Sequence, residues 1–225
     1  ELVRHAPLTA TVHVSSRAAQ WSEPLLWYAR DFLLSFRKGN PMIPVAKPVT
    51  YSQTTITELM IPSYANFGGK IHGGILLSLM DKVAYVCASK HAGSYCVTVA
   101  VENVEFLEPV EVGEMVSMLA SVHYVGRSSM VVGIKVIAEN FKMGTVKHTN
   151  TSYFTMVAKD EKGSPAEVPG LIIESKDELR RFMEAIQRKT LKAQYKKELQ
   201  NAKQALPEGI EKQVLKGERC LLNIE

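Results

Sequence analysis

The sequence is poor in the residues that build disulfide and metal frameworks. It has three cysteines, Cys87, Cys96 and Cys220, and no two of them form a C-x-x-C pair. This scarcity excludes a disulfide framework and a cysteine zinc site, and it is typical of proteins from a reducing compartment. An H-E-x-x-H motif and a Cys/His ligand cluster are also missing, so no metal site is expected.

Long apolar runs are missing as well. The longest apolar-rich stretch near the start runs from Pro24 to Phe36 and is interrupted by Arg30 and Asp31. It falls short of the ~20 residues that a helix needs to span a bilayer. We therefore expect no membrane span and a cytoplasmic protein. The chain begins with Glu1, and its first residues are poor in acidic side chains. An organellar targeting signal is therefore the alternative to a cytoplasmic location.

The chain has no large excess of either charge: 27 Lys and Arg against 23 Asp and Glu give a net charge of +4. The surplus cations lie between residues 180 and 203, where they alternate with glutamates. This pattern predicts a solvated helix that packs on its own domain or on a neighbouring subunit. No aromatic residues are interleaved for base stacking, so no nucleic-acid partner is expected.

An apolar fraction of 46% is enough for a globular core. We divide the chain into an N-terminal appendage (1–48), a central domain (49–170) and a C-terminal amphipathic helix with a tail (171–225). The appendage contains a predicted short helix that starts at Ser22 and stops near Gly39. The C-terminal helix is predicted to start at the capping box formed by Ser175 and Glu178.

The central domain is predicted to contain one strand, then a helix, then four more strands. The predicted segments are a strand at Thr50 to Leu59, a helix at Gly73 to His91, and strands at Cys96 to Phe106, Met115 to Tyr124, Ser129 to Glu139 and Thr145 to Ala158. Apolar residues alternate in Val97, Val99 and Val101 and again in Val132, Ile134 and Val136, as in strands with one covered face. Short turns favour an antiparallel meander wrapped around the helix, an α+β fold.

A glycine turn stands directly before this helix. Gly73 and Gly74 remove side chains where the helix begins, so that unpaired backbone N–H groups carry the positive end of its dipole. Such an end suits a phosphate, a carboxylate or a polarised carbonyl oxygen. Tight packing of the turn explains the two glycines equally well. Neither a Walker loop nor a dinucleotide-binding spacing is present.

Asp81 is an unusual residue for this otherwise apolar helix. A carboxylate there needs hydrogen-bond partners or a raised pKa, and both are common in general bases. An ion pair with Lys82, or a narrow exposed strip shared with Ser78, is the alternative. Asp81 lies seven residues after Gly74, roughly 10 Å along the helix. One subunit can hardly bring both to one reacting group, whereas two copies packed about a twofold axis can.

Two motifs carry a family resemblance over residues 49–169. The pattern N-x-x-G-x-x-x-G-G-x-L-L-x-x-M-D, from Asn66 to Asp81, and E-x-V-x-F-L-x-P-V-x-V-G-E, from Glu102 to Glu114, resemble the hotdog-fold acyl-CoA thioesterases, in particular the cytosolic acyl-CoA hydrolase subfamily. The resemblance implies a curved antiparallel sheet around a long central helix. It also implies homodimers, often assembled as trimers of dimers, that hydrolyse acyl-CoA without a metal or redox cofactor, coenzyme A being part of the substrate.

The resemblance also implies roles for residues. Asn66 and Asp81 match the catalytic pair, Gly74 and its N–H would polarise the thioester carbonyl, and Gly73 would lie beside the substrate. Asp81 of the partner subunit would activate water or attack directly; the sequence does not choose. His72 is a candidate base, although packing or carbonyl orientation explains it better.

A turn further along the chain corresponds to a loop that contacts the coenzyme A arm in this family. Its residues are Gly126, Arg127, Ser128 and Ser129. An ordinary surface hairpin is an equally good reading of the same four residues.

Two other functions on the same fold are the alternatives. A non-catalytic acyl-CoA-binding protein could act as a sensor or scaffold, but ligand binding alone does not require both Asn66 and Asp81. A hydratase or dehydratase would pair a His with a carboxylate, for which His72 is the candidate. The acyl chain length, the pathway and the roles of the two extensions are left open by the sequence.

Overall fold

The computed structural model describes residues 46–204, 216–221 and 223. All of them belong to one compact unit, Pro44–Glu225. The helix predicted between Ser22 and Gly39, and nearly all of the predicted appendage, lie outside the described residues.

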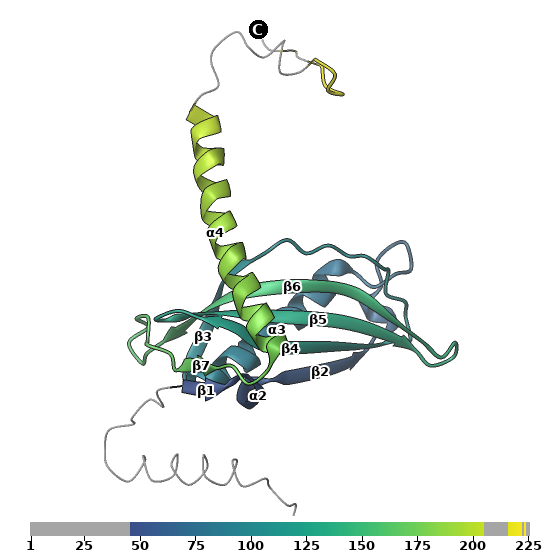
Figure 1. Cartoon of the computed structure of the whole chain (residues 1–225). Helices are drawn as coiled ribbons and strands as arrows, with labels where there is room; N and C mark the ends of the chain where they lie inside the picture. Colours follow the sequence, from purple (N-terminus) through teal and green to yellow (C-terminus); the bar gives the residue numbers. More distant parts are fainter. Residues whose placement is uncertain (1–45, 205–215, 222, 224–225) are drawn as a thin grey trace, which may run out of the picture. The chain divides into compact units, whose positions relative to one another are not determined.

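Five strands form one antiparallel sheet and two short strands pair separately (Figure 1). The elements, in chain order, are β1 (Ala46–Pro48), α2 (Val49–Ser52), β2 (Thr54–Leu59), η2 (Pro62–Tyr64), α3 (Gly73–Ala92), β3 (Tyr95–Val101), β4 (Met115–Val125), β5 (Ser129–Asn140), β6 (Thr145–Lys159), β7 (Gly170–Ile172) and α4 (Lys176–Gln204). The strand order in the large sheet is β2-β4-β5-β6-β3. Among the described helices, none combines the length and the apolar character that a bilayer crossing requires.

The sheet curves around α3, and the main core lies between them. The helix buries eight side chains, namely Leu76, Leu79, Met80, Val83, Ala84, Cys87, Ala88 and His91. The facing strands supply Val132, Ile134 and Val136, all at most 1% exposed, which confirms the alternation predicted there. The helix ends at Gly93, whose φ of 72° is left-handed and whose N–H donates to the Ser89 carbonyl at 2.8 Å. The predicted fold, a curved sheet around a long helix, is confirmed.

Two predicted strands have the wrong bounds. Residues Val49–Ser52 form one helical turn, in which the Ser52 hydroxyl donates to the Val49 carbonyl at 3.3 Å, so that β2 starts only at Thr54. The strand predicted from Cys96 to Phe106 ends at Val101, because the chain leaves the sheet there. The strands β4, β5 and β6 match their predictions to within one residue at each end.

Strand β3 does not lie where a simple meander would put it. It pairs with β6 at the far edge of the sheet instead of with β4. A register shift between Thr98 and Ala100 marks a bulge at Val99, and bulges change which face a side chain occupies. Val99, at the bulge, is 55% exposed, and Val101, which pairs with the buried Phe154, is 40% exposed at the open edge of the sheet. The prediction of a covered face was wrong for these two valines.

A parallel ladder joins the beginning and the end of the domain. Ala46 pairs with Gly170 and Pro48 with Ile172, so the predicted domain boundaries at 48 and 170 fall within this ladder. Between them, the buried Lys47 donates from Nζ to the His91 carbonyl at 2.7 Å, next to the C-terminus of α3. A cation at this end stabilises the helix.

Helix α4 covers the face of the sheet opposite to α3 (Figure 1). Its predicted capping box is confirmed: Glu178 N donates to Ser175 Oγ at 3.2 Å, and Ser175 N donates to Glu178 Oε2 at 3.1 Å. Ala185 is its buried side chain, whereas the side chains of residues 189 to 203 are all exposed. The first half of the helix packs on its own domain, which was one of the two predicted alternatives; the other was packing on a neighbouring subunit.

Candidate active site

Asn66 organises the glycine turn before α3. Its Oδ1 accepts from Gly68 N at 2.9 Å and from Lys70 N at 3.2 Å, and its backbone N–H donates to the Lys70 carbonyl at 2.7 Å. Two N–H donors identify the amide oxygen without ambiguity. Because the residue is exposed, the amide nitrogen Nδ2 is the group that can donate to a ligand.

His72 caps the start of α3. It has an extended backbone, with φ of −66° and ψ of 128°, and its Nδ1 accepts from Gly74 N at 2.9 Å. The N–H predicted to polarise a carbonyl is therefore capped by the imidazole in this structure. For Gly74 to donate to a substrate, the exposed His72 ring must turn away. Nδ1 must be unprotonated to accept this bond, which sets the tautomer of the ring.

Both glycines of the turn have a packing reason. A Cβ on Gly73 would lie 3.2 Å from the Phe106 ring, and a Cβ on Gly74 would lie 3.0 Å from His72 Nδ1. These approaches are tighter than ordinary van der Waals contact. The ring of Phe106 thus lies directly over the opening of the helix, which links the second sequence motif to the first.

Asp81 lies in the middle of α3 and is exposed. The Thr98 hydroxyl on β3 donates to Asp81 Oδ1 at 2.6 Å. The ion pairs within the described residues do not include one between Asp81 and Lys82. The carboxylate thus has the hydrogen-bond partner that the sequence required, and its second oxygen remains able to accept a proton or attack.

The sequence did not predict Thr98 as a partner of Asp81. Within the run YCVTVAV it looks like an ordinary strand residue. The signal was the two-residue period of a strand, since Thr98 shares a face with Cys96. Cys96 is a buried residue of the core, so the same face turns Thr98 towards α3.

The turn from Gly126 to Ser129 joins β4 and β5. It is closed by a bond from Gly126 N to the Ser129 carbonyl at 2.7 Å. The carbonyls of Arg127 and Ser128 accept from Val168 N and Ala158 N, both at 2.9 Å. The backbone is thereby fixed, whereas the Arg127 side chain is exposed and can reach towards a ligand.

One chain places the predicted site residues at two ends of the sheet. Ile71 N donates to the Val110 carbonyl, which puts the turn from Asn66 to Gly74 near the beginning of β4. The turn at 126–129 follows the end of β4, and eleven residues of strand span roughly 35 Å. The structure therefore brings Asp81 and Thr98 together but separates the two turns.

Register places Thr98 nearer to the second of these turns. Thr98 pairs with Met156 on β6, and Met156 pairs with Met130 on β5, next to Ser129. Asp81, which Thr98 contacts, lies about halfway along α3. The four predicted coenzyme-binding residues thus share an end of the sheet with Thr98, and the Asn66 turn occupies the other end.

The surface around Asp81 is apolar. Large side chains on α3 and β3 are 36% to 60% exposed there, namely Leu77, Tyr85, Val86, Tyr95, Val99 and Val101. Strand β3 is also an edge strand of the described sheet, and an edge presents backbone groups to a further strand. Exposed apolar patches of this kind mark surfaces that another molecule covers. Across the described ranges, no group of three or more His, Cys, Asp or Glu could hold a metal ion.

Comparison with known proteins gives a family. The model of the thioesterase superfamily matches residues 68–156. Protein VdlD from Helicobacter pylori is 43% identical over 137 residues, which cover 61% of this chain and 78% of that protein. A solved hexameric acyl-CoA thioesterase is 34% identical, with a TM-score of 0.62, covering 72% of this chain and 99% of the other.

A third similar protein is the acyl-CoA hydrolase of Staphylococcus aureus, solved with butyryl coenzyme A. It is 29% identical, has a TM-score of 0.64, and the match covers 72% of this chain and 98% of that one. Structures of that protein also describe variants in which an Asn, an Asp or a Thr is replaced by Ala. The Asn precedes the Asp by 15 residues and the Thr follows it by 17, the same spacing as Asn66, Asp81 and Thr98 here. By sequence and fold, the chain belongs to the thioesterase superfamily, among its hotdog-fold acyl-CoA hydrolases.

Proposed function

We propose that this protein hydrolyses acyl-CoA to a free fatty acid and coenzyme A, in a site formed by two copies of the chain. The observation that carries the proposal is the separation within one chain. The hydrogen-bonded pair of Asp81 and Thr98 lies on an exposed apolar surface, away from Asn66 and Gly74 at the opening of α3. A twofold axis beside β3 brings the opening of one α3 to the carboxylate of the other.

The opening of α3 supplies stabilisation of negative charge. Asn66 Nδ2 and Gly74 N–H would donate to the thioester oxygen, which becomes an oxyanion when the carbonyl carbon is attacked. The helix dipole favours the same charge. His72 would leave its capping position when the substrate carbonyl takes its place on the Gly74 N–H.

Asp81 of the partner subunit supplies the base or the nucleophile. As a base it takes a proton from water, whose oxygen attacks the carbonyl carbon; the C–S bond then breaks and the proton passes to the departing thiolate. As a nucleophile it attacks the carbonyl carbon itself: the C–S bond breaks, coenzyme A leaves as a thiolate that takes a proton from water, and the resulting anhydride is then hydrolysed to the fatty acid and the free carboxylate of Asp81. In both routes Thr98 Oγ1 orients the carboxylate. A single turnover in ¹⁸O-labelled water distinguishes them, because only the second route puts label into the protein.

The turn from Gly126 to Ser129 would bind the coenzyme A arm. It lies at the same end of the sheet as Thr98, so the same copy would supply both to a given site. Arg127 can contact a phosphate with two parallel hydrogen bonds. We further propose a homodimer as the smallest active unit, assembled as a trimer of dimers; the hexameric relative supports this larger assembly.

The activity is tested by thiol release from acyl-CoA of several chain lengths. Asp81→Ala should lower kcat at least ~100-fold, the range for loss of a general base, and Thr98→Ala should lower it less. Glu161→Ala, an exposed substitution in the turn after β6, is the matched control and should leave it unchanged. Coenzyme A binding without turnover in the wild type would instead establish the sensor or scaffold function.

The sharing of the site is tested by mixing two inactive variants. An Asp81→Ala copy still supplies an intact Asn66, and an Asn66→Ala copy still supplies an intact Asp81. Random reassociation of equal amounts should restore about a quarter of the wild-type activity, because half of the dimers are mixed and each has one intact site. No recovery in verified heterodimers would show that each chain builds its own site.

A further inference from the structure

A pocket lies on the face of the sheet opposite to α3, beneath the first turns of α4. Its volume is about 610 Å³, within the range of small-molecule sites. Strands β2, β4, β5 and β6 form its floor, and α4 forms one wall through Arg180, Arg181 and Glu184. It shares no residue with the site proposed for acyl-CoA, and α4 lies outside the residues matched by the family model.

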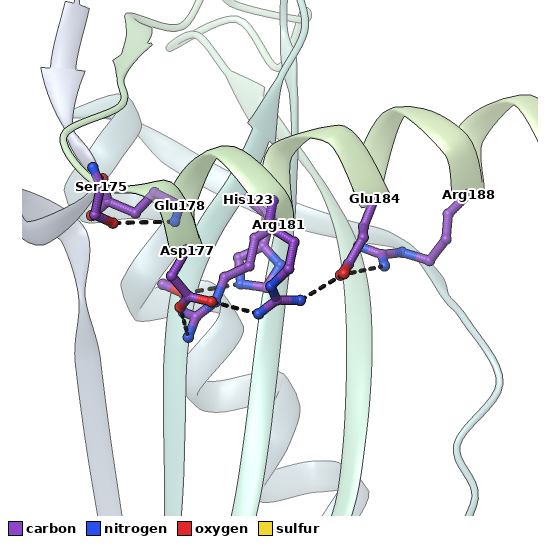
Figure 2. Close-up of polar contacts among 9 residues, drawn as sticks. His123, Ser175, Asp177, Glu178, Arg181, Glu184 and Arg188 are labelled. Atoms are coloured by element: carbon purple, nitrogen blue, oxygen red, sulfur yellow. Dashed lines mark hydrogen bonds and ion pairs between the residues drawn. The ribbon is translucent and has the colours of Figure 1, made fainter.

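A bulge in β4 shapes the pocket. The register shifts between Val122 and Tyr124, so that His123 and Tyr124 both project from the outer face. Gly133 on β5 makes room for the imidazole, because a Cβ there would overlap the His123 ring. His123 Nε2 bonds to Ser121 Oγ at 3.1 Å, and Arg181 Nη1 donates to the same oxygen at 3.5 Å. Figure 2 shows His123 beneath α4, next to Arg181.

Cations outnumber anions around the pocket. Lys135, Arg180 and Arg181 line it, against the carboxylate of Glu184, which Arg180 binds at 2.6 Å. Asp177, beside the lining, binds Arg180 at 2.5 Å and Arg181 at 2.6 Å, so that one positive charge, on Lys135, stays without a carboxylate partner among these groups. Burial, followed by Arg181 and Arg188, lowers the pKa of His123 to about 4. The imidazole is therefore neutral at pH 7 and lies in a positive local field, which favours an anionic ligand.

The donor of the pocket that lacks an ion-pair partner in the described chain is Lys135. Within the described residues, Lys135 is an exposed cation of the sheet that forms no ion pair. The hydroxyls of Thr55 and Thr151 line the same floor, and that of Thr151 is bonded to His148 Nε2 at 2.9 Å. Leu119, 41% exposed, gives the floor an apolar part. Ammonium, guanidinium and hydroxyl donors around an apolar strip suit a small molecule with one oxyanion group.

We propose that this pocket binds a small organic anion, whose carboxylate or phosphate group contacts Lys135 and Arg181 while its apolar part lies along Leu119. Helix α4 completes the site, so the C-terminal extension gives this chain a binding site that the hotdog core alone lacks. The proposal does not depend on the hydrolytic function.

Titration calorimetry on the full chain tests the proposal with two probes, hexanoate and inorganic phosphate, at constant ionic strength. We expect saturable binding of at least one probe, and the one that binds identifies the head group. Lys135→Gln and Arg181→Gln should each weaken binding about tenfold or more, since each removes a charge-assisted contact. Lys162→Gln, at an exposed turn, is the matched control and should bind like the wild type.

Two further measurements separate this site from the active site. Asp81→Ala should bind the probe with unchanged affinity, and Lys135→Gln should hydrolyse acyl-CoA at the wild-type rate. Circular dichroism verifies the fold of each variant, and Lys135→Gln, which breaks no ion pair of the described chain, guards against unfolding caused by changes in α4. Absence of saturable binding by both probes, or equal binding by wild type, Lys135→Gln and Arg181→Gln, overturns the proposal.

Discussion

Helices α3 and α4 lie on opposite faces of one sheet and are attached by different forces. Eight of the twenty residues of α3 are buried in the apolar core. Helix α4 buries Ala185 and otherwise makes contacts at the edge of solvent: Phe182 lies 5.4 Å from the Tyr124 ring, and the Arg188 guanidinium lies 3.5 Å from the Tyr153 ring. Apolar burial depends little on salt, whereas salt weakens ion pairs and cation–π contacts.

This difference between the two helices shows which parts of the fold can carry functional residues. The buried face of α3 holds the helix in place, so a charged residue such as Asp81 on its exposed face does not destabilise the fold. Helix α4 lies on the outer face of the sheet and adds charged groups there, so that a pocket forms between the helix and the strands.

The largest effect is expected from Met80→Ala on α3. Met80 is fully buried, and truncation of a buried methionine costs about 2–5 kcal/mol because it leaves a cavity. Met183→Ala on α4, where the side chain is 55% exposed, is the matched control and should change stability by less than about 0.5 kcal/mol. Urea unfolding followed by circular dichroism measures both. Equal losses in the two variants would contradict the proposed difference between the helices.

Acid should weaken the attachment of α4 through His123. Its pKa falls from 6.5 to about 4 on folding, so the unfolded chain binds the proton more readily between these values. The neutral ring contributes up to about 3 kcal/mol to the free energy of unfolding. This contribution is fully present above pH 6.5 and is lost as the pH falls towards 4. Arg181 and Arg188 add to the shift and Glu184 opposes it.

Unfolding free energies between pH 7 and 4 check this sign. His123→Gln should flatten the slope, and His148→Gln, at an exposed position, should keep it. The buried His91 also has a lowered pKa, but it is common to all three proteins, so the difference between the slopes isolates His123. A His123→Gln slope equal to that of the wild type would rule out this acid effect.

Gly133→Ala should separate α4 from the sheet. The added Cβ overlaps the His123 ring, and overpacking of this kind costs about 1–3 kcal/mol. We expect faster hydrogen exchange in the first turns of α4 and unchanged exchange in α3. The double variant Gly133→Ala with His123→Ala should recover part of the loss, because the two side chains no longer compete for one space. Faster exchange in α3 would show that the damage has reached the core instead.

The sequence predicted the elements whose signals are local. The period of α3, the alternation at Val132, Ile134 and Val136, and the capping box at Ser175 all come from residues within a few positions of each other. The motif from Asn66 to Asp81 located both halves of the candidate site for the same reason, and its division between two copies was inferred from helical rise alone.

The missed features depend on contacts between distant residues. The place of β3 at the far edge is set by pairing with β6, more than 40 residues later, which periodicity does not report. The exposure of Val99 and Val101 follows from a bulge and from the open edge of the sheet, and alternation in the letters reveals neither. Thr98 became visible as a partner of Asp81 only when helix and strand were placed together.

The smallest effect is expected from Arg180→Gln. Arg180 binds Asp177 at 2.5 Å and Glu184 at 2.6 Å on the surface of α4. Exposed ion pairs of this kind gain little because water already solvates both charges. Thermal unfolding of Arg180→Gln should therefore match that of the wild type. Arg188→Gln should lower the midpoint measurably, since Arg188 is mostly buried against Tyr153 and its loss removes a contact that excludes water. If Arg180→Gln were the more damaging variant, α4 would be attached by its surface charges, and 1 M salt should then release it from the sheet.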